Sequence, residues 1–290
     1  MTARNRSWFG AAAGLTLVAL ALDGVTAEPA AAPVAAPVAS PSAAPMDGKA
    51  RIATGGYLPP GTAPDSNLLI PPPPAPGSAA MARDEEAMRA AVALRGTPRW
   101  DQATTDALLF TPAATSVFSC AAGIRIAADA TPKLNALLRK AAPDLAMAVY
   151  PSKRKYLRAR PFMVNGEPSC TPQDEAGLRR DGSYPSGHSA IGYGWGLILA
   201  ELVPDRAAQL VARGRAFGES RRVCNVHWLS DVEEGRVVAT AVYARLHAEA
   251  AFRADLDAAR AEVELLRLKK VPAPDCAREN AALANSRAWR

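Results

Sequence analysis

The stretch from Ser220 to Asp231 places an arginine, a histidine and an aspartate within about three helical turns. If the segment around His227 is helical, Asp231 follows at i+4 on the same face, where its carboxylate can orient the imidazole through one ring nitrogen. The other nitrogen is then available as a nucleophile or a base. Arg221 lies close enough in sequence to hold the oxyanion that such a histidine would attack. The alternative is a solvent-facing helix that carries unrelated polar residues.

Two cations upstream have the spacing of an anion clamp. Lys153 is followed by six residues and then by Arg160 and Pro161. Lysine offers a point charge and arginine a planar fork, so the two together can hold two edges of a phosphate. The pair alone is weak evidence, because the segment is rich in basic residues and a solvated basic face would have the same composition.

A third cluster, Pro185-Ser186-Gly187-His188, stands directly before an apolar run. Ser186 can cap a helix that starts here, and Gly187 lets the backbone approach a ligand, so backbone N–H groups and the helix dipole would face a bound anion. His188 could then give a proton to a leaving group. The alternative is an ordinary capped helix start with an exposed histidine.

In chain order the three clusters read Lys-x6-Arg-Pro, Pro-Ser-Gly-His and Ser-Arg-x5-His-x3-Asp, and this combined pattern resembles the signature of the type 2 phosphatidic acid phosphatase superfamily at every fixed position. The chain also resembles the class A bacterial non-specific acid phosphatases. That similarity runs from about Tyr57 to Leu266 and includes three further stretches, namely Leu68-Leu69 leading into Pro71–Pro74-Ala75, Gly182-Ser183-Tyr184, and the run from His227 to Val232.

The resemblance implies a role for each matching residue. His227 would attack phosphorus and form a phosphohistidine, Asp231 would orient it, and His188 would protonate the departing alcohol. The groups expected to hold the phosphoryl oxygens are Lys153, Arg160, Ser186, the amide of Gly187, and Arg221. Phosphoryl transfer depends mostly on positioning and charge stabilisation, and neither a metal ion nor another cofactor is expected.

The hydrophobic spacing predicts an all-α protein with a single-domain helical bundle, since no run alternates as a strand would. A helix that ends or bends at Pro151 is expected over 145–150, and a helical spacing continues beyond Asp231 to Pro272. The other expected helices cover residues 78–95, 100–109, 131–142, 189–203 and 205–217.

The chain divides by composition into four parts. Residues 1–27 have the three parts of a secretory signal peptide, with a membrane anchor as the alternative. Residues 28–77 form an extended Ala/Pro-rich arm, in which Tyr57-Leu58 and Leu68-Leu69-Ile70 are apolar enough to strap it to the domain. The phosphatase domain is expected over 78–270 and a tail over 271–290. The mature protein is therefore predicted to be periplasmic and free of the membrane.

The charge and the cysteine content indicate which binding partners and which disulfides to expect. The formal charge of +6 is spread along the chain and does not indicate nucleic-acid binding. Four cysteines in an exported chain predict up to two disulfides, with three possible pairings. Cys224 is expected to be a disulfide partner and not a catalytic thiol. The tail is expected to be tied down through Cys276.

The function predicted is an exported acid phosphatase that hydrolyses varied small phosphomonoesters. The resemblance also makes a homo-oligomer an expectation. A vanadium-dependent haloperoxidase is the main alternative, because that family is similar at the anion-binding positions. An integral-membrane lipid phosphatase and a phosphate-binding protein are further alternatives, although a binding protein has no need of both His188 and the His227–Asp231 pair.

Overall fold

The computed structural model describes residues 55–109, 111–269 and 274–284. Every regular element in these ranges is a helix, which confirms the predicted all-α class. The predicted signal peptide and most of the predicted arm lie outside the described residues. The α-helices in chain order are α1 Ser66–Leu69, α2 Ala79–Val92, α3 Pro98–Asp106, α4 Ser119–Ala122, α5 Pro132–Met147, α6 Tyr150–Tyr156, α7 Pro161–Asn165, α8 Glu175–Leu178, α9 Gly187–Leu202, α10 Ala207–Val223, α11 Leu229–Leu246, α12 Ala250–Leu268 and α13 Ala277–Ala284; three short 3-10 turns lie at Ala114–Phe118, Pro172–Asp174 and Pro204–Arg206.

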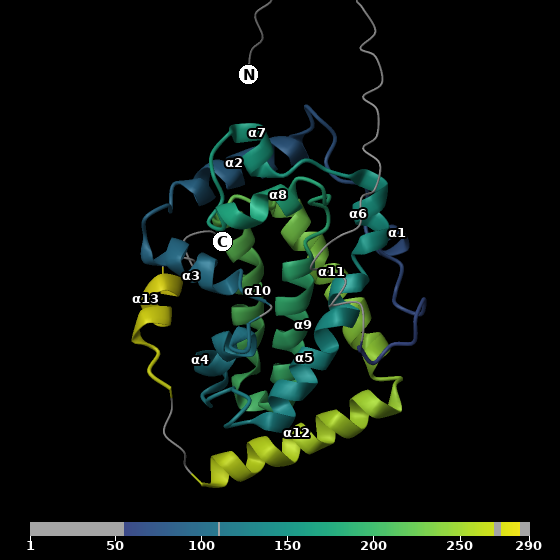
Figure 1. The fold of residues 1–290 in the computed structure, drawn as a ribbon, viewed down its shortest axis with the longest axis vertical. Helices are drawn as coiled ribbons and strands as arrows, with labels where there is room; N and C mark the ends of the chain where they lie inside the picture. The colour runs from purple at the N-terminus through teal and green to yellow at the C-terminus, as the bar shows by residue number, and fades with distance from the viewer. Residues whose placement is uncertain (1–54, 110, 270–273, 285–290) are drawn as a thin grey trace, which may run out of the picture. The chain divides into compact units, whose positions relative to one another are not determined.

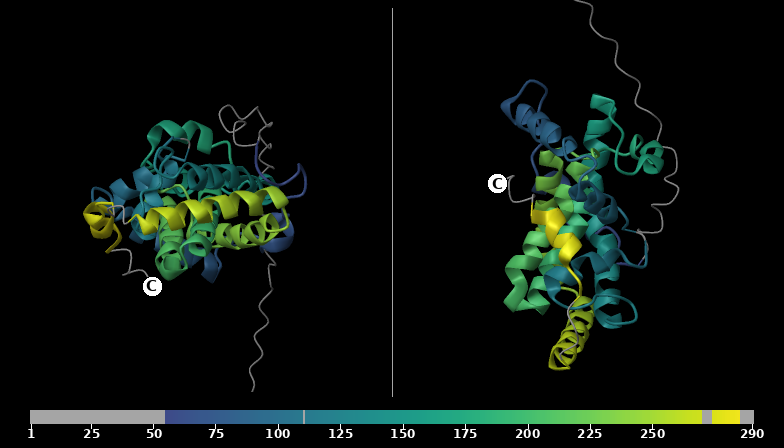
Figure 2. Two further views of the ribbon diagram at one scale, coloured as in Figure 1. Left: turned by 90° about the horizontal axis from the view of Figure 1, so that it is seen from below. Right: turned by 90° about the vertical axis from the view of Figure 1, so that its left-hand side faces the viewer.

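Helix α9 is the centre of the packing, with α5, α10 and α11 against it (Figure 1). It is apolar on most sides, as expected for a helix surrounded by others. Helix α12 runs across one end of these helices and packs on α5 and α9, which the view from below also shows (Figure 2). The site residues described below come from the elements at the other end of α9.

Glycines let α9 and α10 approach closely. A Cβ added at Gly196 would lie 2.9 Å from the carbonyl oxygen of Leu210, and one at Gly214 would lie 2.9 Å from that of Gly192. Any side chain at either position would push the two helices apart. This contact brings the C-terminal end of α10, which carries Arg221, beside the N-terminal end of α9.

Two prolines act differently from the sequence-based expectation. The two helices expected over 131–142 and 145–150 begin as one helix, α5, which continues through Pro143 to Met147. Pro151 does not end a helix but lies in the first turn of α6, where a proline needs no backbone partner. An interior proline costs about 3 kcal/mol. The apolar face of α5 continues past Pro143 to the fully buried Leu145, so packing outweighs that cost.

The segment before α2 is attached to the helical core. Tyr57 and Ile70 are buried in it, and the backbone N–H of Tyr57 donates to Asp144 at 2.7 Å. Leu68 is instead 87% exposed. Among the described residues no helix is long and apolar enough to span a membrane.

Two disulfides are present, Cys120–Cys276 and Cys170–Cys224, with Cα–Cα distances of 5.6 and 4.7 Å. The first ties the segment before α13 to α4, which confirms the expected attachment of the tail. The second confirms that Cys224 is a disulfide partner.

Candidate active site

The segment that carries His227 is a turn between two helices. Helix α10 ends at Val223 and α11 begins at Leu229, so the helix around His227 that would bring Asp231 to its side by i+4 spacing does not form. Asn225, at φ 61°, redirects the chain between them. Asp231 still reaches His227, because it lies in the first turn of α11 and its carboxylate accepts from the backbone N–H of Trp228 at 2.9 Å.

The two neighbours of the His227 ring determine its tautomer. Nδ1 lies 3.2 Å from Oδ2 of Asp231, and Nε2 lies 3.1 Å from Nη1 of Arg160. A guanidinium can only donate hydrogen bonds, so Nε2 must accept and carries a lone pair. The proton is then on Nδ1, where the carboxylate accepts it. His227 is 3% exposed, and its Nε2 has the lone pair that the predicted nucleophile would need.

Burial and nearby cations keep this imidazole neutral. The pKa of His227 is well below 6.5, first because the ring is buried and then because Arg160, Lys153 and Arg221 are close to it. A neutral imidazole retains its Nε2 lone pair at mildly acidic pH.

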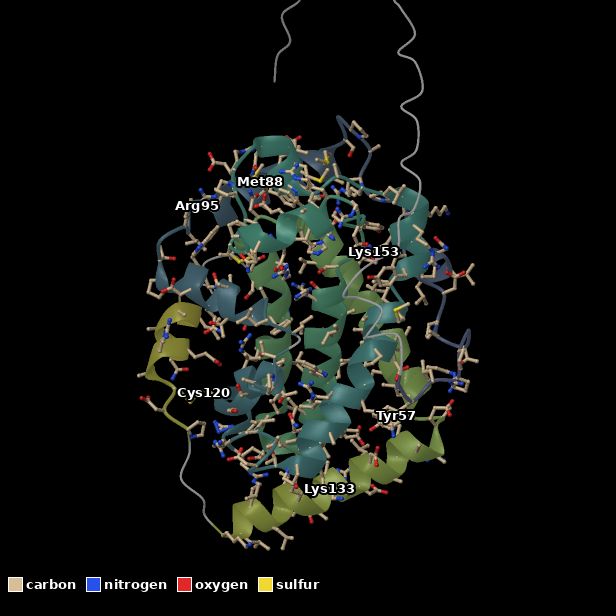
Figure 3. All side chains as sticks on the ribbon, in the orientation of Figure 1. Tyr57, Met88, Arg95, Cys120, Lys133 and Lys153 are labelled. Atoms are coloured by element: carbon tan, nitrogen blue, oxygen red, sulfur yellow. A yellow bond between two sulfur atoms is a disulfide. The ribbon has the colours of Figure 1, made fainter. Side chains whose placement is uncertain are left out.

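Lys153 and Arg160 are not a solvated basic face, since their exposed fractions are 4% and 1%. Both donate to the carbonyl oxygen of Gly182, and Lys153 also donates to that of Ser183 at 3.4 Å. The carboxylate of Asp181 lies 3.3 Å from Arg160 and 3.9 Å from Lys153. The two cations therefore converge on one loop, which connects α8 to α9. Lys153 can be located in Figure 3, away from α12.

Arg221 is a buried cation with few partners. It is 2% exposed, its Nη1 lies 3.8 Å from Sγ of Cys224, and its Nε has no hydrogen-bond partner among the described residues. Burial, together with the charge of Arg160, lowers the pKa of Arg221 to about 9. A bound anion would supply the missing negative charge.

The predicted Pro-Ser-Gly-His cluster starts α9. Ser186 is the N-cap, and its side chain accepts from the backbone N–H of Ser189 at 3.2 Å. Its own N–H donates to the carbonyl oxygen of Asp231 at 2.8 Å, which joins the starts of α9 and α11. His188 is half-buried, and its Nε2 lies 3.2 Å from the carbonyl oxygen of Ala107, at the end of α3. A carbonyl only accepts, so Nε2 of His188 carries a proton.

Two residues beside this site, Arg158 and Asp84, were not predicted from the sequence. Arg158 donates to Asp231 at 2.6 Å and to Asp84 of α2 at 2.7 Å. Arg158 lies inside the Lys-x6-Arg-Pro spacing but belongs to a run of basic residues that does not distinguish it. Asp84 is one of three consecutive acidic residues in α2, and nothing in their sequence indicates which one faces inward.

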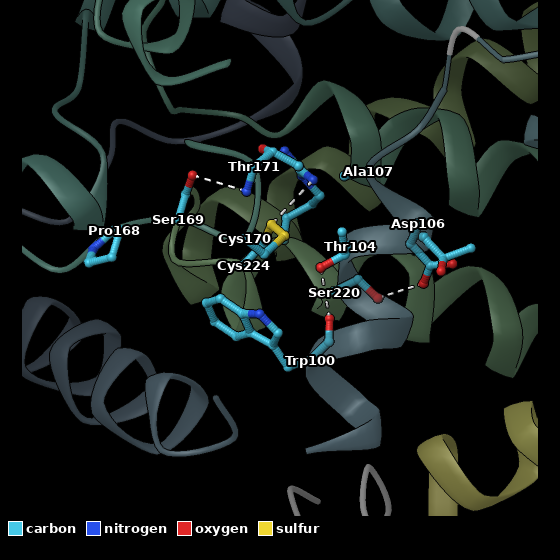
Figure 4. Close-up of a disulfide and its surroundings, with 12 residues drawn as sticks. Trp100, Thr104, Asp106, Ala107, Pro168, Ser169, Cys170, Thr171, Ser220 and Cys224 are labelled. Atoms are coloured by element: carbon cyan, nitrogen blue, oxygen red, sulfur yellow. Dashed lines mark hydrogen bonds between the residues drawn. A yellow bond between two sulfur atoms is a disulfide. The ribbon is translucent and has the colours of Figure 1, made fainter. Parts of the chain in front are cut away.

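The Cys170–Cys224 disulfide lies next to the site. It joins the loop before α8 to the residue that follows α10, and the backbone N–H of Cys170 donates to the carbonyl oxygen of Cys224 at 3.2 Å (Figure 4). The disulfide therefore secures the end of α10 close to Arg221.

The arrangement is suited to a tetrahedral anion. It combines a neutral histidine with a lone pair, three buried cations around that histidine, a helix N-terminus, and a second histidine with a proton on Nε2. These groups can stabilise charge on phosphoryl oxygens while Nε2 of His227 attacks phosphorus. Among the described residues no group of His, Cys, Asp and Glu side chains could hold a metal ion.

Residues 135–252 match the PAP2 superfamily. This range contains all the site residues that the sequence predicted. An acid phosphatase of Zymomonas mobilis is 41% identical over 203 residues, which cover 70% of this chain and 77% of that protein. A non-specific acid phosphatase of Salmonella typhimurium is 39% identical over 203 residues, with 69% and 80% covered. One from Providencia stuartii is 38% identical over 215 residues, with 74% and 86% covered.

Proposed function

The chain belongs to the acid phosphatases of the PAP2 superfamily, and from that membership we propose that it hydrolyses a broad range of small phosphomonoesters through a phosphohistidine intermediate. The reaction proposed needs no metal ion or other cofactor. The observation that carries the proposal is the neutral His227, held between a donor and an acceptor beside the buried cations Arg160, Lys153 and Arg221.

In the first step, Nε2 of His227 attacks phosphorus and the bond from phosphorus to the ester oxygen breaks. A phosphoryl oxygen replaces Nε2 as the acceptor of Arg160, and Lys153, Arg221 and the amides at the start of α9 hold the remaining oxygens. Asp231 stabilises the positive charge that develops on the His227 ring. The doubly protonated His188 gives its Nδ1 proton to the departing alkoxide, which leaves as the alcohol, and His188 becomes neutral.

In the second step, water attacks phosphorus and the bond from phosphorus to Nε2 breaks. The now neutral His188 accepts a proton from that water, inorganic phosphate forms, and both histidines return to their starting states. Because Nε2 of His188 is engaged with Ala107, donation while that contact persists requires the doubly protonated ring. We therefore propose an acidic to near-neutral pH optimum, since a histidine without perturbation titrates near about 6.5.

Export to the periplasm is part of the proposal. It is supported by the signal-peptide pattern of residues 1–27 and by the two disulfides, which are typical of oxidising compartments. N-terminal sequencing of the protein purified from the periplasm should give a start near Glu28. A homo-oligomer is proposed from the family resemblance, and light scattering would test it.

The test of the reaction uses p-nitrophenyl phosphate with a chelator present and no added vanadate. Wild type should release p-nitrophenol, and ³²P-labelled substrate should leave a label on the denatured protein that is stable to alkali and labile to acid, as expected for a phosphoramidate bond. A haloperoxidase would instead need vanadate and peroxide, and a binding protein would turn nothing over. Label that is stable to acid would contradict the phosphohistidine.

The two histidines should differ in how their loss depends on the leaving group. His227→Ala removes the bond-forming atom, so hydrolysis should fall for every ester, by roughly 10⁴-fold or more. His188→Ala should cost about 10²–10⁴-fold on glycerol phosphate, whose alkoxide needs a proton, and much less on p-nitrophenyl phosphate. Measuring kcat for both variants on both esters provides the test. Equal losses on the two esters for His188→Ala, with chemistry rate-limiting, would exclude His188 as the acid.

A further inference from the structure

Arg158 lies between two buried carboxylates behind the nucleophile. Although it is only two residues before Arg160, its guanidinium contacts Asp231 and not the imidazole of His227. Nη1 lies 2.6 Å from Oδ1 of Asp231 and Nη2 lies 2.7 Å from Oδ2 of Asp84. The three side chains are 10%, 0% and 2% exposed. The fork is also held over the ring of Trp228, at 5.2 Å from the centroid.

Asp84 is itself fixed by the start of α11. It accepts from the backbone N–H of Ser230 at 2.8 Å and from the Ser230 hydroxyl at 2.6 Å. That hydroxyl oxygen also lies 2.8 Å from Nη1 of Arg158. A continuous chain of contacts therefore runs from Asp84 through Arg158 to Asp231 and His227, and it links α2 to the turn that carries the nucleophile.

The support that Asp231 gives to the His227 ring depends on whether its carboxyl group is ionised. Burial raises the pKa of Asp231, while Arg158 and the N–H of Trp228 act in the opposite direction. A protonated Asp231 would lose part of its capacity to accept the Nδ1 proton of His227 and to stabilise positive charge on that ring.

Several charged or titratable groups surround Asp231. Arg158 and His227 touch it. Lys153, Arg160 and Tyr184 act on it through space, and Asp84 lies behind Arg158. Arg158 is the cation in direct contact, so its loss should have the largest effect on the carboxylate.

We propose that Arg158 and Asp84 are positioning residues for Asp231, in which Arg158 keeps the carboxylate ionised and Asp84 holds Arg158 so that the carboxylate stays in register with His227, and that the two together set the lower end of the pH range in which the nucleophile works. The inference rests on the proposed function, since it concerns the same histidine. Arg158 supplies the charge that favours the carboxylate, and Asp84 with Ser230 fixes the direction of its fork. Asp84 also moderates that charge, because Arg158 is shared between two carboxylates.

The two residues should therefore shift the pH profile in opposite directions. We would measure kcat/KM for p-nitrophenyl phosphate from about pH 4 to pH 8. Arg158→Gln removes a cation, so the acid limb should move up by about one pH unit, which gives a deficit of about tenfold at acid pH that disappears as pH rises. Asp84→Asn leaves Arg158 unshared, so the acid limb should move down, with a smaller loss of kcat. Arg158→Lys should be intermediate, because it keeps the charge without the fork.

Arg83→Gln is the matched control. Arg83 pairs with Glu233 at 2.6 Å and so joins the same two helices, α2 and α11, but on the exposed surface. Its pH profile should equal that of wild type.

The outcomes distinguish this inference from the proposed function. If wild type does not hydrolyse the ester, the proposed function fails. If wild type is active and the acid limb is unchanged in both network variants, or moves the same way in both, the positioning role is wrong. If Arg158→Gln does not fold, the direction of the shift in Asp84→Asn decides.

Discussion

Arg213 and Arg221 lie about two turns apart on α10 and are almost equally buried, at 3% and 2% exposed, but their surroundings differ. Arg213 forms two hydrogen bonds with Asp106, at 2.6 and 3.2 Å, and its Nε lies 3.3 Å from Glu279 of α13. Asp106 also accepts from Ser220 at 2.6 Å. Arg221 forms no salt bridge with a carboxylate of the described residues.

The pKa values of the two arginines move in opposite directions. Burial lowers the pKa of both, yet at Arg213 the charges of Asp106 and Glu279 outweigh burial and raise it. At Arg221 burial and the charge of Arg160 outweigh the more distant charges of Asp174 and Asp106, and the pKa falls to about 9. One helix therefore carries an arginine inside a charge-balanced network and, about two turns further along, an arginine that forms no salt bridge with the described residues. The difference supports the proposal that Arg221 holds an anion.

The largest effects are expected when Arg213 and Arg221 are replaced one at a time. Arg213→Met leaves Asp106 and Glu279 without their cation, so the free energy of unfolding should fall by about 3–5 kcal/mol. Arg221→Met removes an uncompensated charge, so stability should be unchanged or higher, while kcat/KM should drop by roughly 10²–10³-fold. Urea denaturation and steady-state kinetics on both variants check this. A loss of stability in Arg221→Met as large as in Arg213→Met would remove the distinction.

A smaller effect is expected when an anion binds beside Arg221. Vanadate adopts the five-coordinate geometry of phosphoryl transfer, so it should inhibit competitively and bind in the micromolar range or tighter. At a concentration of about 100 times Kd it should add about 2.7 kcal/mol to the stability of the wild type. Thermal melts with and without vanadate measure this. The same gain in Arg221→Met would show that Arg221 does not contact the anion.

The parts of the site that were predicted are those marked by spacing in sequence. Lys153, Arg160 and His227 were found from such spacing, and the structure places the two cations around the histidine. Asp84 is remote in sequence from Asp231, and its acidic neighbours Glu85 and Glu86 share its local pattern. Only the packing of α2 against α11 selects it.

Helix boundaries could not be predicted where the local preference of the sequence and the tertiary packing disagree. The proline penalty at Pro143 is visible in the sequence, whereas the gain from burying Leu145 depends on α9, which packs against α5. The turn that carries His227 could not be distinguished from a helix for a similar reason, since the spacing of His227 and Asp231 is compatible both with one helix and with an aspartate in the first turn of the next.

The smallest expected effect is the pH dependence of stability that follows from the lowered pKa of His227. The pKa of His227 in the folded protein lies well below its usual value of 6.5, so between these two values the unfolded chain binds the additional proton. The contribution of the neutral ring is therefore fully present above about pH 6.5 and falls by up to about 1.4 kcal/mol per pH unit below it. His227→Gln should lack this slope. Urea denaturation at several pH values compares the two proteins.

The same stability measurements should be repeated with saturating vanadate. The anion neutralises the surrounding cations and should raise the pKa of His227 toward its usual range, so the slope in the wild type should flatten. The filled site would then behave as the Arg213 network does, with its charges compensated inside the protein. Parallel stability curves for wild type and His227→Gln in the absence of vanadate would mean that the cations do not act on His227, and the contrast between the surroundings of Arg213 and Arg221 would rest on Arg221 alone.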